Sequence, residues 1–511
     1  MKLCQGVLLL AFNHLCCALA ADGPIVATLY GKIQGKYTST AQVFTSIPYA
    51  RPPTNELRWK DSVPPEPWEG VIETVADPPG CPQGIPCNLP LPELTCPKRV
   101  TEDCLYLNVF TPLSAQPDAK IPVMVFFHGG NFLRGYSGGL LYDGQYIANT
   151  SRTIVVTVNY RLGAIGFLVL GEGSDAIEGN YGFKDQRLAL HWVQDNIAAF
   201  GGDPGQVTIW GQSAGAVSVA LHMTTVRSSG LFNKVIMESE PIELTLKDRK
   251  HALKLGTDFS KELGCGDKDI ACLYSKNITL ISAVEDALLS KIVDPLHALE
   301  IFLQWTPTID GVDILDQPFN LLANGEAAEI PTIIGTVSQE GIFFIYEASP
   351  KPLSRVEYDV AVVALFPLHF AAVFRHYPAP EDGQDCRMQL AVAGTDYTFT
   401  CPNRYAVRGF IDTTAAPTWT YVFNHSISFT SWGQNFTFCD GHSCHGVELP
   451  FVFHTAPLAG FNYSQSELEL ADHMVTYWTN FVHTGAPTVL KTTLKTCWIG
   501  PDMMPLTVES L

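Results

Sequence analysis

Short, continuously apolar segments rich in β-branched residues recur along this chain of 511 residues. Strands buried on both faces of a parallel sheet have this pattern, whereas strands with one face in solvent alternate between apolar and polar residues. Residues 188–200 show helical periodicity instead, and Gly201-Gly202 ends it. Strands that alternate with helices predict an α/β fold, with a large, mostly parallel sheet covered on both sides. The predicted strands are 121–127, 153–159, 207–210, 234–237 and 331–337.

Two long segments have weaker strand character, from about residue 245 to 330 and over much of 345 to 435. After residue 25 the chain contains no low-complexity linker and no internal repeat. Large α/β folds often form a single unit. We therefore expect one domain, residues 21–511, in which these two segments form helical insertions above the sheet and over the active site.

The N-terminus has the features of a secretory signal peptide. Lys2 precedes a largely apolar stretch from Gly6 to Leu15, which is too short to span a bilayer, and Ala18-Leu19-Ala20 provides small residues for cleavage. The sequence thus predicts a signal peptide at residues 1–20 and an extracellular protein, with a retained anchor as the alternative. We expect no membrane-spanning segment in the mature chain, since no second apolar stretch is long enough.

The acidic charge balance argues against one class of partner. The chain carries 32 basic and 51 acidic side chains, a formal net charge of −19. A nucleic-acid backbone would be repelled by this charge. We expect a small-molecule partner, and the sequence does not indicate an oligomeric state.

Secretion determines how the cysteines are interpreted. Eleven of the 14 cysteines follow the predicted signal peptide. In an oxidising compartment they are candidates for disulfide bonds before they are metal ligands, and an odd number leaves at least one thiol free or paired between chains. Sequons for N-glycosylation fit the same compartment. The predicted glycosylated residues are Asn149, Asn277, Asn424, Asn435 and Asn462.

The motif Gly-x-Ser-x-Gly occurs twice, at 211–215 and at 135–139. In a nucleophile elbow the serine lies on a sharp turn between a buried strand and a helix, and only small neighbours fit around it. Ser213 has this context, because the strand 207–210 precedes it and the helical stretch 216–226 follows it. Ser137 is followed by a glycine-rich loop. We therefore predict Ser213 as the nucleophile and a structural role for Ser137.

Acyl transfer also requires hydrogen-bond donors for the oxyanion. His128-Gly129-Gly130 follows the strand 121–127, where hydrolases of this type present their second oxyanion loop. The predicted donors are the backbone N–H groups of Gly129, Gly130 and Ala214. An ordinary Gly-Gly turn is the alternative interpretation.

Several longer motifs resemble one family. Residues 200–215 (FGGDPGQVTIWGQSAG) are similar to the nucleophile signature of the type-B carboxylesterase/cholinesterase family, and residues 102–109 (EDCLYLNV) to its second signature. NYRLG at 159–163 and GNYG at 179–182 also match, and the resemblance extends from about residue 25 to about 487. It implies an α/β-hydrolase fold and a serine carboxylesterase that needs no cofactor and no metal.

The remaining members of the triad follow from the chain order Ser, acid, His. Glu340 comes shortly after the strand 331–337 and resembles the family's acid, a glutamate followed by glycine. His445 begins a match to the family's His-Gly-x-Glu-x-Pro-aromatic motif, and His442 is its rival. Cys439, His442, Cys444 and His445 could alternatively bind zinc, but a disulfide between Cys439 and Cys444 is favoured in an oxidising compartment.

The resemblance also implies the disulfides Cys81–Cys104 and Cys265–Cys272. Proximity in the sequence adds Cys87–Cys96 and Cys386–Cys401 as candidate pairs, which leaves Cys497 over. Ser239 matches a serine that supports the triad in the family, although Glu240 replaces the glycine that usually follows it.

Departures from the family narrow the substrate. Cholinesterases bind the choline cation on a tryptophan of the first disulfide loop, and residues 81–104 contain none, so choline esters are not the expected substrate. At the position directly before the nucleophile, the family most often has glutamate. This chain has Gln212 there, as do juvenile hormone esterases. A non-catalytic adhesion or scaffold protein and an interfacial lipase remain as alternatives to a carboxylesterase.

Overall fold

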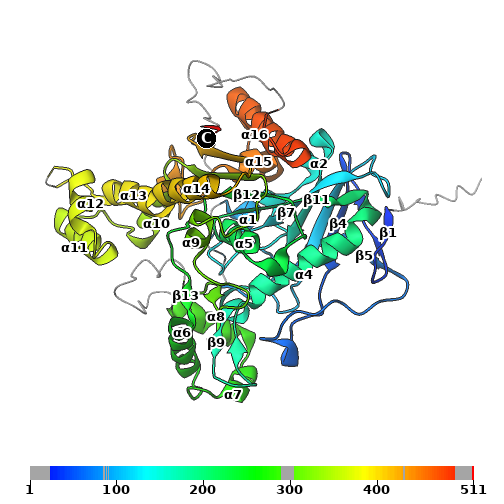
Figure 1. The fold of residues 1–511 in the computed structure, drawn as a ribbon, viewed down its shortest axis with the longest axis horizontal. Helices are drawn as coiled ribbons and strands as arrows, with labels where there is room; N and C mark the ends of the chain where they lie inside the picture. The colour runs from blue at the N-terminus through cyan, green and yellow to red at the C-terminus, as the bar shows by residue number, and fades with distance from the viewer. Residues whose placement is uncertain are drawn as a thin grey trace, which may run out of the picture.

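A ten-stranded sheet forms the centre of the described part of the protein (Figure 1). The computed structural model describes residues 23–84, 87, 89, 91–288, 304–381, 383–429, 432–488 and 509–510. In spatial order the strands are β17 (Glu509–Ser510), β16 (Thr418–Phe423), β15 (Thr332–Val337), β12 (Lys234–Glu238), β11 (Gly202–Gln212), β7 (Ile121–Phe127), β8 (Ile154–Val158), β6 (Tyr106–Pro112), β4 (Ala41–Pro48) and β3 (Lys36–Tyr37). The adjacent strands from β16 to β8 run parallel, and antiparallel strands flank them. The mostly parallel sheet of an α/β-hydrolase fold is confirmed.

The parallel strands are buried on both faces. Along β7, the side chains of Val123, Val125 and Phe127 belong to one hydrophobic core, and those of Met124 and Phe126 belong to another. Successive side chains of a strand point to opposite faces, so both faces of the sheet are covered. This double burial explains why the sequence of these strands is continuously apolar.

Helices cover the two faces. One core is shared with α4 (Tyr181–Asn196) and α5 (Ala214–Thr224). The other is shared with α2 (Gln145–Ser151), α15 (Leu449–Phe453) and α16 (Gln465–Thr484), which lie together in Figure 1. The helix predicted at 188–200 is the second half of α4 and a short 3₁₀ turn, and Gly201 ends it with a φ of 90°.

The first insertion is helical, as predicted, and has a core of its own. It contains β13 (Lys247–Asp248), α6 (Arg249–Glu262), α7 (Ile270–Tyr274), α8 (Ile278–Leu288), β14 (Thr308–Ile309) and α9 (Pro318–Ala323). Its apolar side chains pack with Trp59 and with α3 (Gly163–Phe167). A buried carboxyl joins α8 to α3, because Glu285 Oε2 accepts a hydrogen bond of 2.9 Å from the backbone N–H of Ala164.

The second insertion is a group of helices at one end of the sheet (Figure 1). It consists of α10 (Glu340–Ala348), α11 (Arg355–Leu365), α12 (Phe370–His376), α13 (Arg387–Thr395) and α14 (Cys401–Thr413), and a π-helical turn at Asp396–Thr400 connects the last two. β16 follows these helices. The sequence did not predict this strand, because its residues mix buried, half-buried and exposed positions instead of forming an apolar run.

Smaller elements complete the described fold. They are β1 (Ile25–Ala27), β2 (Lys32–Gln34), β5 (Val71–Glu73), α1 (Pro92–Thr95), β9 (Val169–Leu170) and β10 (Ile177–Glu178). The described helices include none that is both long and apolar enough to cross a membrane. The predicted signal peptide lies outside the described residues.

Four disulfide bonds occur in the described part of the chain, and four predicted pairs are thereby confirmed. They are Cys81–Cys104, Cys87–Cys96, Cys265–Cys272 and Cys439–Cys444. Cys497 lies outside the described residues.

The predicted pair Cys386–Cys401 is wrong, because both thiols are free, the first buried and the second exposed. The two residues flank α13 and the π-helical turn that continues it. Fifteen residues of helix span about 22 Å, and a disulfide requires Cα atoms within about 7 Å.

Candidate active site

Ser213 lies on a sharp turn between β11 and α5, with φ 57° and ψ −124°. Two glycines make this turn possible. A Cβ atom at Gly211 would lie 2.3 Å from the carbonyl oxygen of Gly215, and one at Gly215 would lie 1.9 Å from the carbonyl oxygen of Phe127. Glu238 at the end of β12 holds the turn from the other side, since its carbonyl accepts a 2.9 Å hydrogen bond from the N–H of Ser213. The predicted strand–turn–helix context of Ser213 is present.

Ser137 occupies a different environment. It is buried, its N–H donates to Asn159 Oδ1 at 2.6 Å, and its carbonyl and Oγ face the side-chain amide of Asn108. A 3₁₀ turn at Leu140–Tyr142, not an α-helix, follows the motif. Ser213 lines the large cavity at the end of the sheet, and Ser137 does not.

Glu340 and His445 meet beside this cavity although 105 residues separate them. Glu340 is fully buried at the start of α10; its Oε1 accepts a 2.8 Å hydrogen bond from the N–H of Val337, at the end of β15. Its Oε2 lies 2.5 Å from Nδ1 of His445. A carboxylate can only accept, so Nδ1 of His445 carries a proton and donates it to Glu340.

Two bonds made by residues directly before His445 restrain the loop that carries it. The disulfide Cys439–Cys444 closes the chain directly before His445, and the N–H of Ser443 donates to Gln339 Oε1 at 2.8 Å, next to Glu340. His442, the rival base, is absent from the cavity wall that contains His445. Because Cys439 and Cys444 are bonded to each other, they do not form the zinc site considered as an alternative.

The second nitrogen of His445 faces Gln212, the residue directly before Ser213. The side-chain nitrogen of Gln212 lies 3.2 Å from Nε2 of His445. An amide nitrogen donates, so this contact places a lone pair on Nε2. Within the described residues, no hydrogen bond joins Ser213 Oγ to His445, and Gln212 occupies the position that a bound serine hydroxyl would take. Sequence reasoning did not anticipate this contact.

The loop after β7 lies against the serine. A Cβ atom at Gly129 would lie 3.1 Å from Cβ of Ser213, and Gly130 has a φ of 104° that favours glycine. The backbone N–H groups of Gly129, Gly130 and Ala214 donate no hydrogen bond to the described residues. They are therefore available as donors, as the oxyanion prediction requires.

Asn131 is a residue of this loop that sequence reasoning missed. Its φ is 57°, its backbone N–H is also without a described partner, and its side chain lines the cavity with Ser213. Asparagine tolerates the left-handed region better than other residues with a side chain. Its position directly after Gly129-Gly130 was the available signal.

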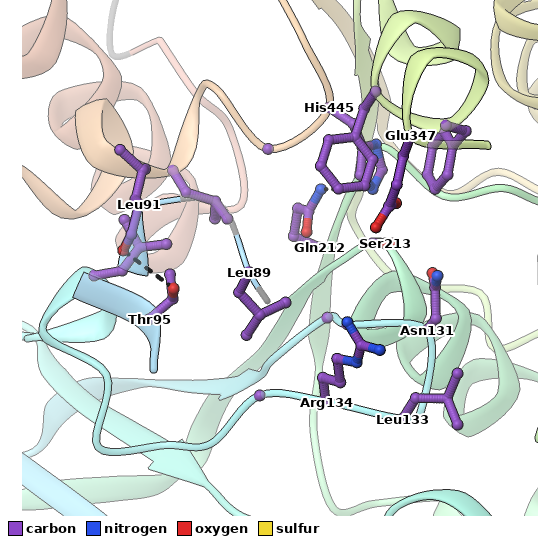
Figure 2. A pocket seen from close by; sticks show the side chains of 18 of the residues that line it. Leu89, Leu91, Thr95, Asn131, Leu133, Arg134, Gln212, Ser213, Glu347 and His445 are labelled. Carbon is purple, nitrogen blue, oxygen red and sulfur yellow. Dashed lines mark hydrogen bonds between the residues drawn. The ribbon is translucent and has the colours of Figure 1, made fainter. Parts of the chain in front are cut away.

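The cavity has a volume of about 460 Å³ and a largely apolar wall (Figure 2). Its apolar side chains include Leu89, Leu91, Leu133, Phe343, Phe344 and Trp432. Arg134 and Glu347 also line it, and burial raises the pKa of the Glu347 carboxyl, against the opposing effect of Arg134. Trp432, from another part of the chain, contributes an indole to the cavity wall. The cavity therefore contains a tryptophan although residues 81–104 have none.

Buried carboxyls lie behind the triad. Glu238 accepts hydrogen bonds from the indole N–H groups of Trp210 and Trp478, and Glu448 lies 3.4 Å from Ser239 Oγ. Burial raises the pKa of Glu238 to about 8 and that of Glu448 well above its usual value. Ser239 thus contacts Glu448, and no described hydrogen bond joins it to the triad.

Glu240 replaces the usual glycine and is buried as well, which raises its pKa. Glu238 and Glu240 follow the apolar strand as unremarkable charged residues in the sequence, so their burial was not predicted.

Comparison with known proteins decides the family, since the model of the carboxylesterase family matches residues 22–499. The chain belongs to the carboxylesterase family. This carboxylesterase-family protein is 40% identical over 466 residues to the cAMP-regulated D2 protein of Dictyostelium discoideum. The aligned region covers 91% of this chain and 85% of that protein. It is 34% identical over 468 residues to para-nitrobenzyl esterase of Bacillus subtilis (strain 168), covering 91% of this chain and 90% of that protein. Acetylcholinesterase of Danio rerio is 32% identical over 547 residues, covering 94% and 83%. The predicted family resemblance is confirmed.

Proposed function

We propose that this protein hydrolyses carboxylic esters through an acyl-enzyme intermediate, with Ser213 as the nucleophile, His445 as the general base and Glu340 as the acid that orients it. The observation that carries the proposal is the hydrogen bond between His445 Nδ1 and buried Glu340, beside a cavity that Ser213 also lines. This is the base–orienter pair that nucleophilic catalysis by serine requires.

In the first step, the Ser213 hydroxyl replaces Gln212 at Nε2 of His445 and transfers its proton there as Oγ attacks the ester carbonyl. Hydrogen bonds between catalytic groups are often completed only when substrate binds. Buried Glu340 stabilises the imidazolium that forms. The imidazolium then protonates the leaving alcohol, and water repeats the attack on the acyl-enzyme.

The oxyanion of each tetrahedral intermediate binds the N–H groups of Gly129, Gly130 and Ala214. Ala214 is the first residue of α5, where the helix dipole favours negative charge. One such donor contributes about 100-fold to 1,000-fold in rate. The apolar cavity wall supports a neutral ester as the substrate.

We also propose that residues 1–20 are removed as a signal peptide, that residues 21–511 form one domain, and that the protein is secreted and glycosylated. Four disulfide bonds support an oxidising compartment. All five sequon asparagines (Asn149, Asn277, Asn424, Asn435 and Asn462) are exposed, as glycan acceptors must be.

Two variants test the proposed activity. The substitution Ser213→Ala is expected to lower the hydrolysis of 4-nitrophenyl butyrate by more than about a thousandfold, because no nucleophile remains. Ser137→Ala, the matched change in the other motif, is expected to leave activity intact. Secretion and thermal unfolding of both variants report the fold. Activity that survives in Ser213→Ala would contradict the assignment, and an inactive wild-type protein over a panel of esters would favour the adhesion or scaffold alternative.

A further inference from the structure

A second, smaller compartment lies beside the catalytic cavity. It has a volume of about 40 Å³, and Asn131 and Phe344 line both spaces. Most of its wall is apolar, with Leu244, Ile345 and Phe399 among the lining residues. The carboxamide of Asn131 is therefore a polar group at the junction of two largely apolar spaces.

The side chain of Asn131 takes no part in holding the described fold together. The loop backbone is fixed by other bonds: the N–H groups of Leu133 and Arg134 both donate to the carbonyl of Gly130, and the carbonyl of Phe132 accepts from Gly163 at 2.7 Å. Within the described residues, the Asn131 carboxamide has no hydrogen-bond partner. Glycine would also satisfy the φ of 57°, so the backbone conformation does not by itself require a carboxamide at this position.

The position of the Asn131 carboxamide indicates which part of a bound ester it would contact. Figure 2 draws His445 and Asn131 on opposite sides of Ser213. The leaving alcohol must take its proton from His445 and therefore lies on the imidazole side of the serine. The acyl group then lies on the side of Asn131. The small compartment extends from Asn131 to Phe344 and Phe399, whose rings lie 5.0 and 5.3 Å from the His445 ring.

We infer that Asn131 is a specificity-determining residue, whose side-chain N–H donates a hydrogen bond to a polar atom near the carbonyl of a short acyl group. The inference rests on the proposed ester hydrolysis. A purely apolar acyl chain would cover the carboxamide and leave it unpaired, which is costly, whereas an acyl group with an ether or hydroxyl oxygen would pair it. The preferred substrates are esters of short oxygen-bearing acids with a larger alcohol in the main cavity.

Two substrates of equal shape test this inference. 4-Nitrophenyl methoxyacetate and 4-nitrophenyl butyrate differ only by an oxygen in place of a methylene group. The measurement is the ratio of their kcat/KM values, which does not depend on the fraction of active protein, and the intrinsic reactivity of the two esters cancels when variants are compared. We expect Asn131→Gly to lower this ratio by about tenfold, the effect of one hydrogen bond.

The variants distinguish a role of Asn131 in substrate selectivity from a role in maintaining the backbone conformation of the loop. Asn131→Gly permits the positive φ and removes the carboxamide, while Asn131→Asp keeps the size and removes the donor; both are expected to lower the ratio. Asn55→Gly, at an exposed asparagine with a φ of 53°, is the matched control and leaves it unchanged. An unchanged ratio in both Asn131 variants would overturn the inference while ester hydrolysis stands. Equal losses on both esters would overturn it as well, and a wild type that hydrolyses neither ester would overturn the proposed function together with it.

Discussion

Buried Glu285 gives the protein a pH-dependent stability that one substitution removes. Burial raises the pKa of this carboxyl from 4.5 to about 8, against the opposing effect of the hydrogen bond from Ala164. Between these pH values the folded protein keeps a proton on Glu285 that the unfolded chain has lost. Stability therefore falls as pH rises, and the contribution of Glu285 is fully present only below its unfolded pKa.

The size of the effect follows from the shift. One proton changes the free energy of unfolding by about 1.4 kcal/mol per pH unit, so a shift from 4.5 to about 8 corresponds to roughly 5 kcal/mol over the whole interval. In Glu285→Gln, the amide oxygen still accepts from Ala164, but no proton can be lost. Wild type is therefore expected to lose stability relative to this variant with a slope of about 1.4 kcal/mol per pH unit.

Urea unfolding followed by tryptophan fluorescence at pH 5, 6, 7 and 8, with the disulfides kept oxidised, measures the difference between the two proteins. Other buried carboxyls such as Glu238 titrate in both and cancel in the difference. Glu69→Gln, at an exposed glutamate, controls for the loss of one charge. If the stabilities of wild type and Glu285→Gln run parallel from pH 5 to 8, then burial does not hold the proton on this carboxyl and the reasoning is refuted.

Two further predictions concern the loop and the acid of the proposed triad. Glu340→Gln is expected to lower kcat for ester hydrolysis by about ten-thousandfold, because a neutral amide neither fixes the tautomer of His445 nor stabilises its cation; steady-state kinetics measure this, and a loss of less than tenfold would speak against the assigned acid. Replacing both Cys439 and Cys444 by serine is expected to lower the free energy of unfolding by about 2 kcal/mol, the value for so short a loop, and to reduce kcat as the restraint on His445 is lost. Thermal unfolding and kinetics check this, and unchanged kcat would show that the disulfide does not restrain the base.

The sequence predicted the centre of the fold well because burial on both faces leaves a strong signal. β7 begins and ends at the predicted residues 121 and 127, and the nucleophile turn lies between the expected strand and helix. β16 gave no such signal, since it pairs near the edge of the sheet and its side chains are unevenly buried.

Residues of the site could be predicted where the chemistry requires a particular residue type. Contacts between residues that are far apart in the sequence could not be predicted. Glu340 and His445 could be selected by motif, and the structure brings them within hydrogen-bonding distance. The pair Cys386–Cys401 failed because a spacing of fifteen residues fits a disulfide loop and a helix equally well, and the helix formed. The surroundings of the Asn131 carboxamide, which has no hydrogen-bond partner among the described residues, depend on segments that are distant in the sequence. No local pattern in the sequence records them.

The contact between Gln212 and His445 has a consequence for turnover. Both ring nitrogens are engaged before an ester arrives, Nδ1 by Glu340 and Nε2 by Gln212. The imidazole ring therefore cannot flip freely. The entropic cost of fixing its orientation is incurred once, during folding, and not again in each catalytic cycle. The Gln212 amide is uncharged, so the exchange of Gln212 for the serine hydroxyl swaps one neutral donor to Nε2 for another and moves no charge until the proton itself is transferred.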